Sequence, residues 1–483
     1  MAANLFVAPS LGWTETFTTN ANFGLGGQPQ SDVISELVPS LVLFALTKNL
    51  QVNVRMQVIA LDYLHGTMPD VLLPNGGVLA TFEALDRHFF LEGAATATQS
   101  QSDVFAATPA APSSYNTFTT ESYRLSPYFK GDLPGQVRYV VRSDNALERA
   151  SGSEASSVNS RLTTQSIDLD RMPHPLGWGM HAEAWQTDYT DDTTPIIRQE
   201  LGEAILKVAP DPRLTFSPRG GIEQENFLLD TRPRAVYGGG LLWEPDDRTK
   251  LEGLAQHQFF GTQWTYGFRH REPFLIVNMT GWRDVVTTAQ TLLLLPPGGD
   301  MAGMLDVMLT PSYPDPVERA AAVQAMMALQ NLPQSTAAGS TIYTTIPMLV
   351  TSNKAAITWL GRRDAVSLSG YILRTQDVPS GMNPEYNVGA LTAQTQEAGG
   401  DLTATHHLTP FTSVTASGVA SEIEGIGLTS GEYTREFALT LSLAHLFSPR
   451  TTGFVATRLQ AISSNVTPDA REKAVLIGLS HRF

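Results

Sequence analysis

The chain ends on the eleven residues KAVLIGLSHRF, 473–483, whose side chains alternate in character. Counting back in twos from the C-terminus, one face carries mainly large apolar residues, namely Phe483, His481, Leu479, Ile477 and Val475. The other face carries small, polar or mixed residues. A period of two predicts a β-strand. A strand with one apolar face must bury that face against a protein core or a lipid bilayer.

The same alternation recurs along the whole chain. It is clear in LQVNVRMQVI at 50–59, in QVRYVVR at 136–142 and in EFALTLSLAHLF at 436–447. We count about 22 such strands of roughly 10 to 15 residues, and a tilted strand of about 9 to 11 residues is long enough to span a bilayer. Almost no helical pattern lies between them, so the strands account for most of the chain.

The connections between these strands alternate in length. Tight turns such as TKNL at 47–50 and GRRD at 361–364 alternate with long polar loops such as 101–118. This asymmetry is typical of outer-membrane barrels. We therefore predict an all-β, transmembrane, antiparallel up-and-down β-barrel of about 22 strands, in the range 18–22, with Phe483 as its C-terminal signal at the periplasmic interface. The alternative is a soluble repeat protein such as a propeller, but the sequence has no repeat of about 40 to 50 residues.

Composition points to the same compartment. Charged residues make up 16% of the chain, cysteine is absent and the net charge is −15. No apolar run approaches the roughly 18 residues of a transmembrane helix. The lack of cysteine fits an oxidising compartment, and the negative charge argues against nucleic-acid binding. We expect the bacterial outer membrane, with a mature chain from which the signal peptide is absent.

Residues 289–340 break the strand pattern and divide the chain into strands of 1–288, a helical insertion, and strands of 341–483 that close the barrel. The pattern predicts a short helix from Asp300 to Leu309 and a second helix, capped by Asp315, that ends near Leu329. Its apolar stripe is expected at Val317, Ala320, Ala321, Met326 and Met327. The insertion either folds into the lumen as a plug or packs on the rim as an extracellular cap. If it gates the lumen, its candidate gate residues are Asp315, Glu318 and Arg319.

Alternation also selects the side chains expected to line the lumen. They carry both signs of charge, which suits a hydrophilic cargo such as a sugar, and each of them also fits a structural salt bridge across the barrel. The candidates are Asn53, Arg55, Gln57, Glu92, Arg138, Arg142, Glu183, Glu223, Glu225, Arg269, Arg271, Glu436 and Arg458.

No catalytic or cofactor motif stands out. The sequence has no G-x-S-x-G elbow, no Walker loop and no H-E-x-x-H motif. The histidines in THH at 405–407 and RHR at 269–271 lack the spacing of a site with three or four ligands. We therefore predict no enzyme activity, no catalytic residues, no cofactor and no metal.

Three stretches resemble one known family. They are residues 9–43, residues 243–282 and the helical PDPVERAAAVQAMM at 314–327. The central stretch carries the most recognisable pattern, with Trp243, Pro245, Arg248, Thr249, Phe260, Gly261, His270 and Arg271. The chain resembles the PEP-CTERM-system-associated outer-membrane β-barrel proteins, which occur with exopolysaccharide genes. The resemblance implies a role in moving a secreted polysaccharide across the outer membrane, and it supplies no catalytic residues.

These observations together predict a passive exit conduit for exopolysaccharide. The expected partners are outer-membrane lipid, the polysaccharide, and periplasmic or inner-membrane export components. The alternatives are a general diffusion porin for small hydrophilic solutes and an outer-membrane enzyme that modifies sugars. An energy-coupled transporter is set aside at this stage, because a strand begins near Asn4 where a plug domain is expected.

Overall fold

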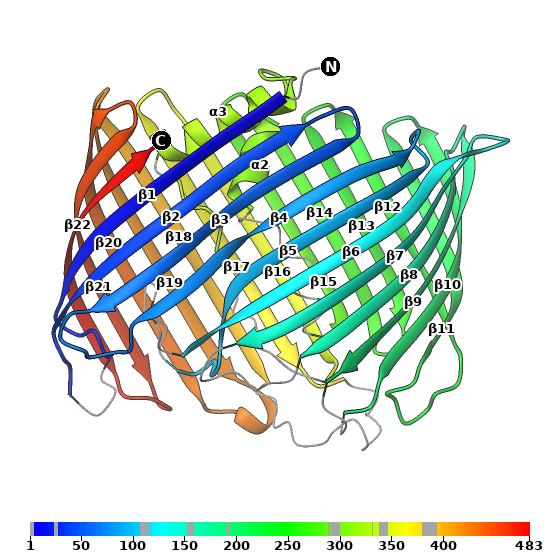
Figure 1. Ribbon diagram of the computed structural model, residues 1–483. Coiled ribbons are helices and arrows are strands. Elements are labelled where there is room, and N and C mark those ends of the chain that lie inside the picture. Colours follow the sequence, from blue (N-terminus) through cyan, green and yellow to red (C-terminus); the bar gives the residue numbers. More distant parts are fainter. Residues whose placement is uncertain are drawn as a thin grey trace.

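The computed structural model describes residues 4–23, 28–106, 113, 116–151, 159–190, 194–287, 290, 300–330, 332–337, 346–378 and 394–483. These residues form one antiparallel sheet of 22 strands that closes on itself as a barrel (Figure 1). The predicted all-β, up-and-down barrel with a helical insertion is confirmed, and the number of strands is the number expected.

Each strand runs antiparallel to the next strand along the chain. In chain order the elements are β1 (Asn4–Thr18), β2 (Asp32–Leu46), β3 (Leu50–Tyr63), β4 (Val71–Leu85), β5 (Phe89–Gln101), β6 (Thr117–Leu133), β7 (Val137–Ser151), β8 (Ser160–Arg171), β9 (Leu176–Tyr189), β10 (Ile197–Asp211), β11 (Leu214–Glu225), β12 (Arg234–Asp246), β13 (Thr249–Gln258), β14 (Gly261–Glu272), β15 (Leu275–Val286), α2 (Met301–Leu309), α3 (Pro316–Leu329), β16 (Met348–Leu360), β17 (Asp364–Gln376), β18 (Thr395–Thr409), β19 (Thr412–Gly425), the 3₁₀ turn η2 (Gly427–Thr429), β20 (Tyr433–Ser448), β21 (Thr451–Ser464) and β22 (Ala470–Arg482).

The barrel closes between its first and last strands. Residues 10–18 of β1 pair with residues 474–482 of β22, so that Thr14 lies opposite Gly478. The backbone N–H of Phe483 donates to the Pro9 carbonyl oxygen at 3.1 Å and extends this pairing. The alternating stretch at the C-terminus is therefore the strand that completes the sheet, and closure pairs backbone groups that an open edge would leave without partners.

The strands keep large apolar side chains on one face. On β22, Val475, Ile477 and Leu479 are 43 to 47% exposed. Ala474, which points to the opposite face, is buried. The registers carry the exposed face around the sheet, since Ile477 lies opposite Val455 on the neighbouring strand. An apolar belt around a closed sheet is the surface that a bilayer covers. The protein is an outer-membrane β-barrel.

The two ends of the barrel differ in their connections. Short turns at 47–49, 86–88 and 361–363 lie at one end, and longer connections such as the one that contains η2 lie at the other. Both chain termini lie at the short-turn end (Figure 1), which faces the periplasm in barrels of this type. Among the described residues, no helix is long and apolar enough to cross a membrane.

Candidate functional site in the barrel lumen

The candidate site is the inner face of the barrel, opposite the exposed apolar belt. On β7, Arg138 and Arg142 alternate with the outward-facing Tyr139 and Val141. The registers place every lumen candidate on this inner face: Asn53, Arg55, Gln57, Glu92, Arg138, Arg142, Glu183, Glu223, Glu225, Arg269, Arg271, Glu436 and Arg458.

The described part of the insertion contacts the inner face at the short-turn end. The α2 side chains of Met301, Leu305 and Met308 belong to one buried cluster with Ile276 and Leu360, which lie beside the short turns of β15 and β16. Helix α3 lies next to α2 and also beside β1 and β2. Figure 1 shows both helices at the end of the barrel that holds the chain termini. Strand β15 ends at Val286 at the long-loop end, whereas α2 lies at the short-turn end.

A charged contact fixes the start of α2 to the wall. The Lys354 ammonium of β16 donates to Asp300 Oδ2 at 2.7 Å. Thr336 also donates to this carboxylate, through its backbone N–H at 2.8 Å and its hydroxyl at 2.6 Å. Burial works to raise the pKa of Asp300, but Lys354 and the Thr336 hydrogen bonds outweigh it and hold that pKa below its usual range. We call Asp300, Thr336 and Lys354 the latch.

Further polar contacts tie the insertion to other strands. Arg271 of β14 donates to the Val307 carbonyl oxygen at 3.2 Å. Gln334 donates to Gln57 of β3 at 3.4 Å. On β18, Asp401 accepts the Ala337 backbone N–H at 2.8 Å. Two lumen candidates, Gln57 and Arg271, therefore hold the insertion in place.

Two of the three candidate gate residues, Asp315 and Arg319, stabilise the helical pair itself, and Glu318 contributes its backbone N–H to the cap. Asp315 is the N-cap of α3, where it accepts the N–H groups of Val317 and Glu318 at 2.8 and 3.0 Å. Arg319 donates to Asp306 of α2 at 2.8 Å. The expected apolar stripe is partly wrong, because Val323, which it omitted, is the buried side chain of α3. The cause is a short helix with alanine on several faces, which weakens the periodic signal.

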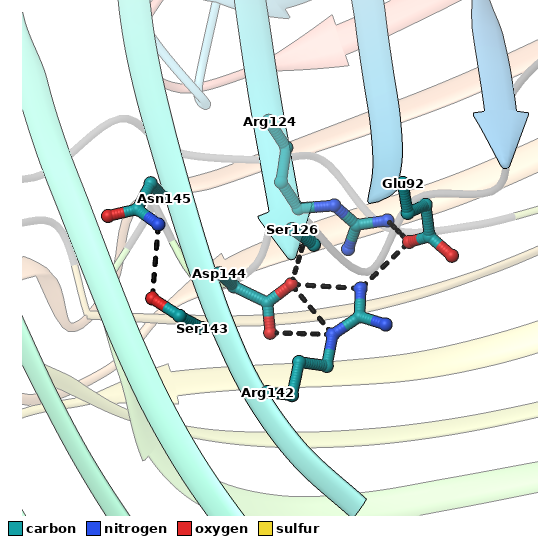
Figure 2. A network of polar contacts seen from close by, with 7 residues as sticks. All are labelled: Glu92, Arg124, Ser126, Arg142, Ser143, Asp144 and Asn145. Atoms are coloured by element: carbon teal, nitrogen blue, oxygen red, sulfur yellow. Dashed lines mark hydrogen bonds and ion pairs between the residues drawn. The ribbon is translucent and has the colours of Figure 1, made fainter. Parts of the chain in front are cut away.

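Figure 2 shows a network of ion pairs on the inner faces of β5, β6 and β7. Arg124 and Arg142 both donate to Glu92 Oε1 at 2.8 Å. Arg142 also donates to Asp144, at 2.9 and 3.0 Å, and Ser126 donates to that same carboxylate. All four charged side chains are at most 24% exposed. We call this network the charged wall.

Aromatic side chains continue the charged wall toward the short-turn end. The rings of Phe90 and Tyr128 stack with centroids 5.0 Å apart. The Lys130 ammonium lies 4.1 Å from the Phe90 centroid and the Arg142 guanidinium 5.1 Å from that of Tyr128. A cavity of about 440 Å³ adjoins this region, lined by Lys130 and Arg138 among others. Cation–π contacts of this kind hold the basic side chains against the wall.

A buried apolar group lies at the long-loop end of β7 to β16. We call this group the mouth cluster: Ala146, Leu162, Trp185, Tyr189, Ile197, Phe227, Leu228, Phe260, Val285, Leu349 and Val378, with Phe259 packed against it. It joins inner-face residues such as Leu162 and Trp185 to residues of the connections such as Phe227 and Leu228. The backbone N–H of Phe259 donates to Glu223 Oε1 at 2.6 Å. The lumen candidate Glu223 therefore holds Phe259 in its position against this cluster.

Sequence reasoning missed most partners of the residues it selected. Arg458 makes a bidentate pair with Glu472, at 2.9 and 3.0 Å. Glu472 lies between Arg471 and Lys473, and Lys354 lies between Asn353 and Ala355, so the apolar alternation that selected the other residues is weak at both positions. The other selected residues Asn53, Glu183, Arg269 and Glu436 are spread over β3, β9, β14 and β20 and join none of the groups described above.

Comparison with known proteins finds similarity of architecture alone. No family model matches the chain, and no curated protein matches it. The solved siderophore receptors PirA from Pseudomonas aeruginosa and PirA from Acinetobacter baumannii each match at 9% identity, over 99% of this chain and 80% of theirs, with a TM-score of 0.45. The copper transporter OprC matches at 10% identity over the same shares, with a TM-score of 0.38.

These matches correct the functional prediction. The solved structures are siderophore receptors and a copper transporter. This finding contradicts the predicted exopolysaccharide conduit, its polysaccharide and export partners, and the porin alternative, so we withdraw them. The predictions erred because a polar lumen of mixed charge suits many hydrophilic solutes and selects none. The resemblance to PEP-CTERM-associated barrels stays a prediction.

Proposed function

We propose that the chain is an outer-membrane uptake protein that admits a selected hydrophilic solute past a movable insertion. The observation that carries the proposal is how the insertion is held. Its described residues meet the wall through the apolar contacts of α2 with Ile276 and Leu360 at the short-turn end. Elsewhere they meet it through polar contacts of 2.7 to 3.4 Å, on strands β3, β14, β16 and β18. Polar contacts of this kind are individually worth about 1 to 3 kcal/mol. A bound solute can therefore displace them.

The position of the insertion supports inward passage. Both its ends join strands at the long-loop end, β15 at Val286 and β16 at Met348, whereas its helices lie at the short-turn end. A solute that enters at the long-loop end reaches the helices only at the other end of the barrel. The remaining path runs along the charged wall, whose carboxylates and guanidinium groups neutralise one another in pairs. We assign passage, and no catalysis, to this wall.

The test is the conductance of the purified protein in planar bilayers, beside a variant in which residues 301–329 are replaced by a short Gly-Ser linker. We expect a small or closed wild-type current and a large increase in the variant. Equal conductance of the two proteins overturns the proposal. Heat-modified electrophoretic mobility checks that both barrels are folded.

A further inference from the structure

A shallow hollow lies on the outer face of the barrel, opposite the lumen. Its volume is about 650 Å³, within the range of about 300 to 1,000 Å³ that is usual for ligand sites. Most of its lining residues share the face of Tyr237 and Trp243, which are 60 and 41% exposed. The registers of β12 to β16 bring six of them together: Gly239, Gly253, Ala255, Trp264, Tyr266 and Asn353. The hollow therefore opens toward lipid.

Small residues form the floor of the hollow and aromatic rings form one wall. Gly253 and Ala255 keep the floor low, and a Cβ added at Gly253 would meet its nearest atom outside the local chain only at 3.7 Å. The rings of Trp264 and Tyr266 stack beside this floor with centroids 5.8 Å apart. The Tyr266 ring lies over Gly281, where a Cβ would come within 2.4 Å of it. A slender apolar chain, such as the acyl chain of a lipid, fits between the floor and this wall.

A polar group faces lipid at the edge of the hollow. The Tyr266 hydroxyl donates to Asn353 Oδ1 at 3.0 Å, across β15. The Asn353 amide nitrogen has no acceptor among the residues that the structure describes. An N–H group that faces hydrocarbon without an acceptor is unfavourable. The ester or hydroxyl oxygen of a lipid would supply this acceptor.

Two arginine side chains lie on the same outer face, on the long-loop side of the hollow. Arg283 lies opposite both Trp264 and Thr351, and Thr351 lies opposite Arg374. Arg283 donates to the Thr262 carbonyl oxygen. In the described part of the chain, no carboxylate pairs with Arg283 or with Arg374. This patch therefore carries two positive charges without a counter-charge from the protein.

The height of these arginines matches the outer surface of the bilayer. Trp359 is an exposed ring at the short-turn end, where an aromatic girdle marks the periplasmic interface. Leu275 lies opposite Trp359, and Arg283 follows eight residues later on the same strand. Eight residues at about 3.3 Å each, tilted by about 40°, rise about 20 Å. Since the apolar belt is about 25 Å tall, the arginines lie near the headgroups of the outer leaflet and the hollow lies below them.

We propose that this surface binds a phosphorylated glycolipid of the outer leaflet, with its phosphate on Arg283 and Arg374 and one acyl chain in the hollow. A guanidinium group binds phosphate through two parallel hydrogen bonds. A second copy of the chain fits less well. A two-fold dimer would set this patch against itself, which brings like charges together and leaves the two hollows facing each other. The site goes beyond the proposed uptake function and does not depend on it.

Native mass spectrometry of the full-length protein, stripped of lipid in detergent, tests the proposal. The probe is lipid A with two phosphate groups, beside phosphatidylethanolamine as a zwitterionic lipid. We expect one tightly bound lipid A and weaker binding of phosphatidylethanolamine. The double variant Arg283→Gln, Arg374→Gln should weaken lipid A binding about tenfold or more, because charged hydrogen bonds are lost. Gly253→Leu, which fills the hollow, should weaken it as well.

Two variants elsewhere on the outer face are matched controls and should bind lipid A as the wild type does. Arg435→Gln removes an outward-facing arginine that already has a carboxylate partner, Glu422 at 2.6 Å. Gly418→Leu adds the same bulk on β19, opposite the exposed Leu402 and Leu439. A Cβ at Gly418 would meet its nearest atom outside the local chain at 3.9 Å, so this position has similar room.

Three results overturn the proposal. The wild type binds no lipid A, or it binds phosphatidylethanolamine equally tightly, or the arginine and glycine variants bind lipid A as the wild type does. A dimer that Gly253→Leu separates would also overturn it, since a second copy would then occupy the hollow. The comparison of the two lipids uses the wild type alone, so it holds even where a variant fails to fold.

Discussion

Replacing Lys354 by methionine should release the insertion from the wall. Methionine keeps an unbranched side chain of similar length and removes the ammonium group. Asp300 then retains the two Thr336 hydrogen bonds but loses its only described ion-pair partner. The Thr336 carbonyl oxygen also loses its contact with the ammonium group, at 3.2 Å. Two elements of the latch are weakened by one substitution.

The size of the effect follows from the geometry. At 2.7 Å two unit charges attract by about 6 kcal/mol where the effective dielectric constant is about 20. The side chains of Lys354 and Asp300 are 23 and 30% exposed, so water screens part of this attraction, and their desolvation offsets more. A net loss of about 2 kcal/mol is typical of a charged hydrogen bond. That loss is a factor of about thirty in the equilibrium between held and released insertion.

Single-channel recording measures this equilibrium as the fraction of time spent open. Lys354→Met should raise the ratio of open to closed time about thirtyfold. Lys250→Met is the matched control, because Lys250 lies on the inner face of β13 and pairs with Glu252 of its own strand at 2.6 Å. Asp300→Asn should mimic Lys354→Met. The double variant should add little, since both changes break the same contact.

Equal open fractions in Lys354→Met and Lys250→Met would refute the reasoning, because the latch would then contribute nothing to the stability of the closed state. Additive effects of the Lys354 and Asp300 substitutions would also count against it. In that case each residue acts through a different contact.

Three further predictions concern pH, the barrel seam and the lipid face. Because the folded pKa of Asp300 is lowered, its contribution to holding the insertion is present above the unfolded pKa of about 3.9 and is lost as the pH falls through the lower folded value. The wild-type channel should therefore open only below about pH 4. In recordings across pH, Asp300→Asn should lack this acid step. Glu472→Gln should lower the free energy of unfolding by about 3 kcal/mol in urea titrations in vesicles, because Arg458 is 7% exposed and loses its ion-pair partner. Ile477→Arg should cost about 2 to 4 kcal/mol in the same assay, whereas Leu476→Arg, one residue earlier on the inner face, should cost clearly less; equal costs would contradict the assignment of faces.

The fold was predictable because alternation is a local signal. The period of two assigns Ile477 outward and Arg458 inward without any knowledge of the neighbouring strands. Closure follows from the number of strands and the apolar face that every strand shares. Asp315 was predictable as a cap for the same reason, since the groups it bonds lie two and three residues away.

The contacts of the site were not predictable, because they join residues far apart in the chain. Lys354 meets a carboxylate 54 positions away and Gln57 meets a side chain 277 positions away. The register of each strand and the path of the insertion must both be known before either pair can be found. The functional prediction failed for a related reason. Mixed charge on an inner face describes a polar lumen, whereas selectivity depends on which charges remain unpaired after folding.

We expect two barriers to passage, one at the mouth cluster and one at the latch. The mouth cluster contains Val285 and Leu349, which lie at the ends of β15 and β16 where the insertion departs and returns. The latch lies further along the same segment, between Asp300 and Lys354. A solute that separates the side chains of the mouth cluster should displace Val285 and Leu349, which lie where the insertion begins and ends. We expect solute binding at the mouth and release at the latch to be coupled. Because coupling is reciprocal, Lys354→Met should also loosen the packing of the mouth cluster.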